Sequence, residues 1–260
     1  MCNESWCEKM YNFFIEEGNK HGDCYFITGS DYNHIKNVLR MKQGDTFLVS
    51  ESGASSLCSL QSFESESVVA RIIEENYQNT NLPVKIYLFQ GLPKGDKMEL
   101  IIQKAVELGA EAIIPIEMNR CVVKLDEKKK KSKISRWQLI AESAAKQSKR
   151  TVIPEICDVI TYKQLVQRIA EIDHFLVPYE CKNGMADTKA ALENIKSGES
   201  VGILIGPEGG FEESEITAAI EAGAKTISLG KRILRTETAA ITAVGMCMLH
   251  IEMNINGDEE

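Results

Sequence analysis

The fold is decided by residues 201–220, which read VGILIGPEGGFEESEITAAI. The uninterrupted apolar run from Val201 to Ile205 is typical of a strand that is buried on both faces. A turn rich in glycine follows at once, and the segment from Phe211 onward predicts a helix. A strand that passes through a short turn into a helix is the unit from which parallel sheets are built.

The same alternation extends in both directions. Further strand-like apolar runs occupy residues 84–90, 112–116, 174–179 and 226–229. Helical patterns, with apolar residues every three or four positions, occupy residues 96–108, 134–148 and 236–252. Apolar strands that alternate with helices predict an α/β fold with a mostly parallel sheet covered on both faces.

The amino-terminal part has a different pattern. Residues 11–74 form short alternating segments, rich in β-branched and aromatic residues and broken by Gly, Ser and Asp, which favours a small β-barrel. The polar stretch that follows ends at Pro83 and is typical of a linker. We therefore expect a barrel domain over 1–74 with an extension over 1–10, a linker over 75–83, and the α/β domain over 84–260.

The charge of the protein is unevenly distributed. The net charge is −8, yet residues 120–150 hold eleven Lys and Arg against three acids, a local charge of +8. Such a basic segment can engage phosphates while the acidic remainder disfavours non-specific binding. A solvated lysine-rich loop is the competing interpretation of this segment.

Several classes of protein are disfavoured by composition. No apolar run approaches the roughly 20 residues that span a bilayer, and the start does not resemble a secretory leader, so we expect a cytoplasmic protein. The eight cysteines are scattered without CxxC pairs or Cys/His clusters. We therefore expect reduced cysteines and no metal site.

Three segments at predicted strand ends carry the chemistry, because ligands of parallel sheets bind beyond the carboxyl ends of the strands. Residues 206–210 form a glycine-rich turn without a phosphate-loop signature, and its Glu208 suits a positively charged ligand such as a sulfonium; a plain tight turn is the alternative. Residues 229–240 place Arg232 and Arg235 before a helix start, which is electrostatically unfavourable and points to RNA or substrate contact. Residues 92–99 offer Lys94 and Lys97, for which a solvated loop is the alternative.

Together these segments resemble the ribosomal RNA small-subunit methyltransferase E family of the knotted SPOUT methyltransferases. The resemblance covers about residues 11 to 250 and is carried by IGPEGGF, LGKRILRTETAA, KGDKMELIIQKAVELGA, NRCVVK and HIKNVLRM. It implies a PUA-like barrel, a carboxy-terminal trefoil knot, a homodimer, S-adenosylmethionine as cofactor, and methylation of N3 of a uridine in 16S ribosomal RNA or the small subunit.

The resemblance also implies roles for individual residues. The cofactor site would comprise Pro178, Ile205, Gly206, Pro207, Gly209, Gly210, Leu229, Gly230, Ile233, Leu234, Arg235 and Thr238. RNA contacts would come from Arg40, Lys94, Lys97, Arg120, Arg150 and Arg232. Arg235 would stabilise charge on the uracil oxygens, and Glu208 would accept the proton if burial raises its pKa.

The sequence departs from the family pattern at two places, and two alternative functions stay open. Asn12-Phe13-Phe14 stands where family members often have an arginine first, and Lys146 stands where many have an acid; both affect RNA docking rather than the cofactor loops. A knotted ribose 2′-O-methyltransferase and a non-catalytic RNA-binding protein are the alternative functions.

Overall fold

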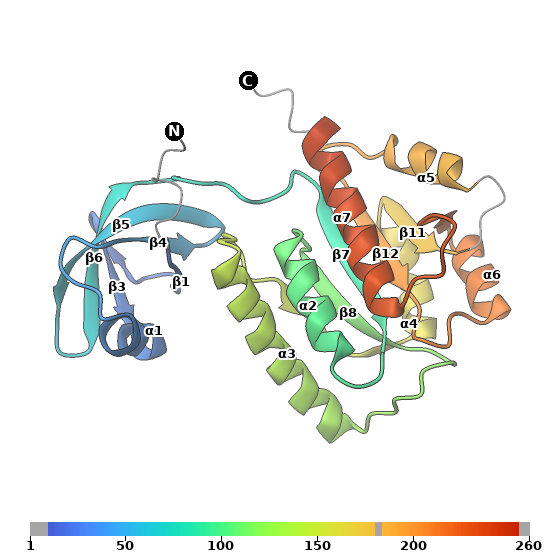
Figure 1. The fold of residues 1–260 in the computed structure, drawn as a ribbon, viewed down its shortest axis with the longest axis horizontal. Coiled ribbons are helices and arrows are strands. Elements are labelled where there is room, and N and C mark those ends of the chain that lie inside the picture. Colours follow the sequence, from blue (N-terminus) through green and yellow to red (C-terminus); the bar gives the residue numbers. More distant parts are fainter. Residues whose placement is uncertain (1–9, 180–183, 255–260) are drawn as a thin grey trace. The chain divides into compact units, whose positions relative to one another are not determined.

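The computed structural model (Figure 1) describes residues 10–179 and 184–254, so most of the expected 1–10 extension lies outside the described residues. The chain divides into two compact units. The first contains residues 1–81 together with 145–153, and the second contains 82–144 and 154–260. Each unit is described by itself.

The first unit is a curled six-stranded sheet with the strand order β1-β4-β5-β6-β3-β2. Its strands are β1 (Asn12–Phe14), β2 (Lys20–His21), β3 (Cys24–Thr28), β4 (Thr46–Glu51), β5 (Ala54–Phe63) and β6 (Ser67–Glu74). All described pairs are antiparallel except β1 with β4. A short helix, α1 (Gly29–Asn33), and a π-helical turn, η2 (His34–Leu39), connect β3 to β4.

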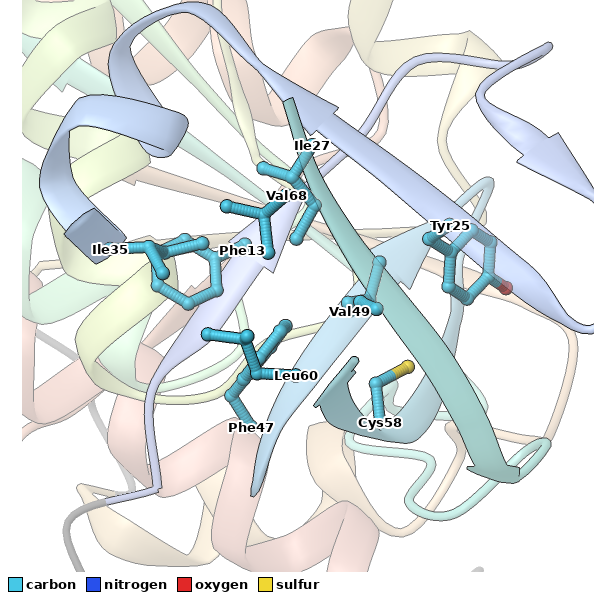
Figure 2. Packing of buried hydrophobic residues seen from close by; sticks show 10 residues of the cluster. Phe13, Tyr25, Ile27, Ile35, Phe47, Val49, Cys58, Leu60 and Val68 are labelled. Atoms are coloured by element: carbon cyan, nitrogen blue, oxygen red, sulfur yellow. The ribbon is translucent and has the colours of Figure 1, made fainter. Parts of the chain in front are cut away.

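The core of this unit is built from alternate strand residues that point to one face (Figure 2). Phe13 and Phe47 pack edge to face, with ring centroids 5.4 Å apart. Ile35, from η2, is fully buried beside them. Each large side chain buried here contributes about 1.5–3 kcal/mol of transfer free energy, which explains why a sheet of short strands is stable.

Residues 145–153 join the first unit through polar contacts. Asn12 Nδ2 donates to the Arg150 backbone oxygen at 2.9 Å, and Thr151 Oγ1 donates to Asn81 Oδ1 at 2.9 Å. Lys146 Nζ forms an ion pair with Asp31 at 2.9 Å. The sequence gives no sign of this association, because it depends on single polar side chains rather than on an apolar pattern.

The second unit contains a seven-stranded parallel sheet with the order β10-β8-β7-β12-β11-β13, and β9 pairs with β8. Its strands are β7 (Lys85–Gly91), β8 (Ala112–Glu117), β9 (Glu155–Ile156), β10 (Ile160–Thr161), β11 (His174–Pro178), β12 (Ser200–Ile205) and β13 (Lys225–Ile227). Every described pair is parallel. The prediction of an α/β fold with a parallel sheet is confirmed.

The helices are α2 (Lys97–Glu107), α3 (Glu127–Gln147), α4 (Tyr162–Arg168), the 3₁₀ turn η3 (Ile169–Glu171), α5 (Met185–Leu192), α6 (Glu213–Glu221) and α7 (Thr236–Asn254). α7 packs on α2, β7 and β12. The lysine-rich segment belongs to α3, which begins seven residues before the predicted 134, so the segment is helical rather than a loop, and Lys128, Lys129 and Lys131 are exposed on that helix. None of the helices within the described ranges is long and apolar enough to cross a membrane.

Candidate active site

A cleft with a volume of about 1420 Å³ opens at the carboxyl ends of β11, β12 and β13. Pro178 ends β11 and Tyr179 follows it. Residues 206–211, apart from Gly209, contribute the turn after β12, and residues 228–235 contribute the segment between β13 and α7. The two glycine-bearing loops singled out in the sequence therefore face the same space, although β13 lies at the edge of the sheet.

Most of the residues proposed from sequence line this cleft. They are Pro178, Ile205, Gly206, Pro207, Gly210, Leu229, Gly230, Ile233, Leu234 and Arg235, together with Glu208, Lys97 and Arg232. Gly209 and Thr238 are absent from the lining that the described residues form; Thr238 is exposed on α7, and Gly209 packs against Arg120.

Sequence reasoning missed part of the lining. Phe211, Met185 and Ser228 also face the cleft, and the Phe211 ring lies edge to face with Tyr179 at 6.2 Å. Phe211 could have been found, because it ends the IGPEGGF motif. Met185 could not, because it begins α5 and reaches the cleft only through the path of the chain.

The turn after β12 packs closely against the end of β7 and against Arg120. A Cβ at Gly91, the last residue of β7, would lie 2.7 Å from Pro207 Cδ and 2.9 Å from Met118 Sδ. A Cβ at Gly209 would lie 2.9 Å from Arg120 Cβ. Contacts this short leave no room for a side chain, so glycine is required at both positions for the turn to lie where it does.

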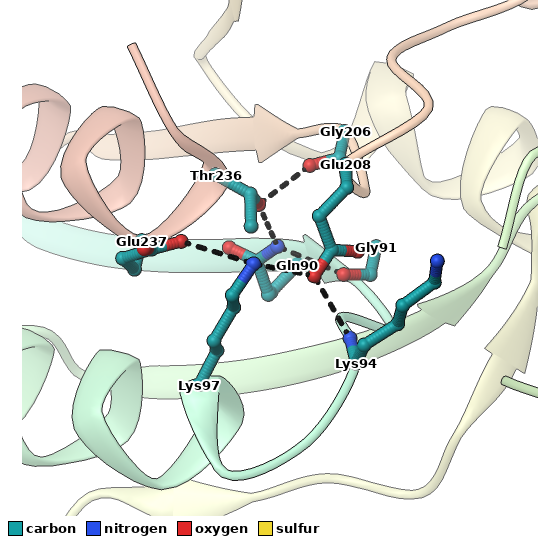
Figure 3. A network of polar contacts seen from close by, with 8 residues as sticks. All are labelled: Gln90, Gly91, Lys94, Lys97, Gly206, Glu208, Thr236 and Glu237. Carbon is teal, nitrogen blue, oxygen red and sulfur yellow. Dashed lines mark hydrogen bonds and ion pairs between the residues drawn. The ribbon is translucent and has the colours of Figure 1, made fainter. Parts of the chain in front are cut away.

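Thr236 is the first residue of α7, and its side chain joins this helix to the turn after β12. The first hydrogen bond of α7 runs from the Ala239 amide to the Arg235 oxygen at 2.8 Å, so the Thr236 hydroxyl does not cap the helix. The Thr236 hydroxyl instead donates to the Gly206 carbonyl at 2.7 Å and accepts from Gln90 Nε2 at 3.0 Å. The start of α7 is thereby tied to the turn after β12 (Figure 3).

Glu208 is held by two groups from the segment between β7 and α2. Its carboxylate accepts from Lys97 Nζ at 2.8 Å and from the Lys94 amide at 3.0 Å (Figure 3). Lys97 Nζ also lies 3.7 Å from Glu237 Oε2. Although burial alone would raise the pKa of Glu208, these hydrogen bonds hold it below its ordinary value of 4.5. Glu208 was expected to accept the proton only if burial raises its pKa. Because its pKa is lowered instead, this condition is not met, and the carboxylate is a fixed negative charge.

Replacing Lys97 by methionine should raise the pKa of Glu208, because burial then acts without the opposing ion pair. In the native protein the lowered pKa means that this contact stabilises the fold fully above about pH 4.5 and is lost as the pH falls through the lowered pKa. A carbon-13 NMR titration of the Glu208 carboxyl measures the change. An unchanged midpoint in the variant, with Lys104→Met on the exterior of α2 as control, would contradict this account of the pair.

Arg235 and its neighbours present cations to the mouth of the cleft. Arg235, Arg232 and Lys231 are all exposed, and the Ile233 side chain among them is fully exposed. Because exposed cations before a helix start do not stabilise the helix, their placement favours contact with an anionic or electron-rich ligand.

The residues expected to contact RNA are distributed over both units. Lys94, Arg120 and Arg232 are exposed in the second unit, and the Lys94 side chain extends away from Glu208 (Figure 3). Arg40 is exposed in the first unit. Arg150 is only 4% exposed, so its guanidinium is not available to a phosphate, and burial argues against the RNA contact expected of it. Among residues 10–179 and 184–254 no group of three or more His, Cys, Asp or Glu could hold a metal ion.

Comparison with known proteins identifies the class that this fold and cleft define. A family model described as an RNA methyltransferase domain matches residues 80–248, and one described as an RNA methyltransferase PUA domain matches residues 27–72. A parallel α/β sheet with a glycine-loop cleft, joined to a PUA domain, is thus the architecture of an RNA methyltransferase.

Comparison with individual relatives identifies the family of RNA methyltransferases to which the chain belongs. The chain is 42% identical to the ribosomal RNA small subunit methyltransferase E of Bacillus subtilis, over 96% of this chain and 100% of that protein. The crystal structure of the Neisseria gonorrhoeae protein of the same name, bound to S-adenosylmethionine, superposes with a TM-score of 0.78 at 30% identity and covers 92% of this chain and 97% of that chain. A Legionella pneumophila methyltransferase in complex with S-adenosylmethionine gives 0.79 at 30% identity, over 93% and 98%. The chain belongs to the ribosomal RNA small subunit methyltransferase E family, which confirms the resemblance seen in its sequence.

Proposed function

We propose that this protein transfers the methyl group of S-adenosylmethionine to N3 of a uridine in 16S ribosomal RNA, in the cytoplasm. The observation that carries the proposal is the meeting of residues 205–211 and 228–236 at one cleft, in a chain of this family. Two of the solved relatives hold S-adenosylmethionine. The cleft of about 1420 Å³ exceeds the several hundred Å³ of a typical small-molecule site, which leaves room for a base beside the cofactor.

The residues present fit this cofactor. Backbone groups of glycine turns offer hydrogen bonds without side chains in the way, Ile205 and Leu234 supply apolar surface, and the ionised Glu208 adds a negative charge to the wall of a site for a sulfonium. When bound, the cofactor supplies an electrophilic methyl group that needs no further activation.

The protein's own task is to align the base and stabilise charge. The N3–H bond of uridine breaks and an N3–C bond forms, while the carbon–sulfur bond breaks to leave a neutral thioether and a released proton. Negative charge develops on the two uracil oxygens that flank N3 as the proton leaves. Arg235, always charged and forked, is the residue of the cleft best suited to stabilise it.

We further propose the trefoil knot and the homodimer that the family resemblance implies. β13 lies at the sheet edge beside β11, yet α7 begins next to Gly206 and Gln90, at the ends of β12 and β7. Residues 228–235 must therefore cross the ends of β11 and β12, as the last loop of a knot would. Residues 180–183, which follow Tyr179 in the sequence, lie outside the described residues. Light scattering that gives the 29.0 kDa of a single chain rather than twice that mass would exclude the dimer.

RNA contact by the rim of the cleft predicts a specific salt dependence. Replacing Lys94 and Arg232 by glutamine should weaken RNA binding and make the slope of log affinity against log salt shallower by about 1.4 to 1.8, since each phosphate contact contributes about 0.7 to 0.9. Filter binding over a salt series measures this. The matched control replaces Lys163 and Arg168, exposed on α4, by glutamine; an equal change in both variants would mean that only net charge matters.

The function is tested by supplying labelled S-adenosylmethionine to small ribosomal subunits that lack the modification, and then mapping the labelled nucleotide by mass spectrometry. Label on a uridine base at N3 supports the proposal. Label on a ribose 2′-oxygen would indicate the alternative transferase. A folded protein that binds RNA but transfers no label would be a binding module.

A further inference from the structure

A buried chain of polar groups runs beneath the cleft from β7 to the turn after β12 (Figure 3). Gln90 is fully buried and Thr236 is 7% exposed. Gln90 Nε2 donates to Thr236 Oγ1 at 3.0 Å, and Thr236 Oγ1 donates to the Gly206 carbonyl at 2.7 Å. Gln90 itself is not part of the cleft lining, and it stands 116 residues before Gly206 in sequence.

A third contact fixes which groups donate and which accept in this series of hydrogen bonds. Gln90 Nε2 also lies 2.8 Å from the Gly91 backbone oxygen, which can only accept a hydrogen bond. The amide must therefore present its nitrogen, not its oxygen, to both Gly91 and Thr236. Because the Thr236 hydroxyl then accepts from Gln90, its single proton remains directed at the Gly206 carbonyl.

We infer that Gln90 is a positioning residue for the cofactor site: it orients the Thr236 hydroxyl, which holds the Gly206 carbonyl and with it the turn that lines the cleft. The cofactor part of this inference rests on the proposed function. The claim that Gln90 and Thr236 hold the turn in place rests on their hydrogen bonds and does not depend on that function.

The other polar anchors of the turn are more accessible to water. The side chains of Lys97 and Glu208 are 34% and 26% exposed, and Arg120, which donates to the Gly209 carbonyl at 3.2 Å, is exposed. Water can replace those partners, whereas the Gly206 carbonyl is buried and would be left unsatisfied. The relay through Gln90 and Thr236 is for that reason the anchor whose loss should move the turn most.

The experiment compares three variants. Thr236→Val removes the hydroxyl at nearly constant volume, Gln90→Met removes the amide, and Thr236→Ser keeps the hydroxyl. Gln138→Met is the matched control, because Gln138 also joins backbone segments of the second unit, through Pro154 and Ile156, but does not face the cleft.

Hydrogen exchange of residues 206–211, followed by mass spectrometry in the absence of cofactor, measures how readily the turn opens, because opening exposes its amides to exchange. We expect exchange about tenfold or more faster in Thr236→Val and Gln90→Met, and near-native exchange in Thr236→Ser and Gln138→Met. Calorimetry with S-adenosylmethionine should show affinity about tenfold to a hundredfold weaker in the first two variants, with the KM for RNA unchanged.

Native exchange in Thr236→Val would overturn the inference, and so would equal acceleration in Gln138→Met, which would indicate general loosening. If the wild-type protein binds no S-adenosylmethionine, the proposed function fails. The exchange comparison still decides the relay in that case.

Discussion

Replacing Arg235 by alanine should slow methyl transfer by about a hundredfold to a thousandfold, the usual effect of removing one group that stabilises charge in the transition state. The residue lines the cleft, is exposed, and stands in the loop between β13 and α7 directly before the helix begins. Because its side chain is exposed, the free energy of unfolding should change by less than about 0.5 kcal/mol. Single-turnover assays on unmodified subunits measure the rate without interference from product release.

Two further variants sharpen the Arg235 test. Arg235→Lys keeps the charge but loses the planar fork, so it should recover only part of the rate. Arg232→Ala removes another exposed arginine three residues earlier, and there the loss should fall on RNA affinity rather than on the single-turnover rate. A wild-type rate in Arg235→Ala would assign charge stabilisation to another group.

Replacing Gly91 by alanine should weaken cofactor binding while leaving the chain folded. The added Cβ would lie 2.7 Å from Pro207 Cδ and 2.8 Å from Pro207 N, so the backbone of the turn has to shift. Overpacking of this kind costs about 1–3 kcal/mol. If the strain falls on the turn, affinity for S-adenosylmethionine should drop by up to about a hundredfold, since 1.4 kcal/mol corresponds to tenfold. Calorimetry and urea unfolding together separate the two effects.

Gly245→Ala is the matched control for that substitution. Its Cβ would make only ordinary contacts, 3.6 and 3.8 Å from the Leu108 methyl groups, within α7. Alanine in a helix interior should stabilise the protein by about 0.5–1 kcal/mol and leave cofactor affinity unchanged. Native affinity in Gly91→Ala would mean that the position of Pro207 does not define the site.

The strands of the second unit could be predicted from the sequence because the pattern that indicates each strand lies within the residues of that strand. The runs that became β7, β8, β11 and β12 are buried on both faces, and a continuous apolar run is sufficient to indicate such strands. The turn after β12 could be predicted for a similar reason, since glycine and proline after a buried strand mark a turn at the carboxyl end of that strand.

What the sequence could not predict depends on distant partners. Gln90 reads as the polar end of a strand, and only the start of α7 shows why it is there. The association of residues 145–153 with the first unit rests on contacts of Asn12 and Thr151 that leave no periodic signal. The direction in which the pKa of Glu208 is shifted could not be inferred either, because it depends on a hydrogen bond from Lys97, which is 111 residues away in sequence.

The most direct test of the central claim is a crystal structure of the protein with S-adenosylmethionine. We predict that the cofactor lies between residues 205–211 and 228–236, with its methyl group open to the side of the cleft where Arg235 stands. Cofactor bound elsewhere while this cleft stays empty, or a methyl group directed away from Arg235, would contradict the account.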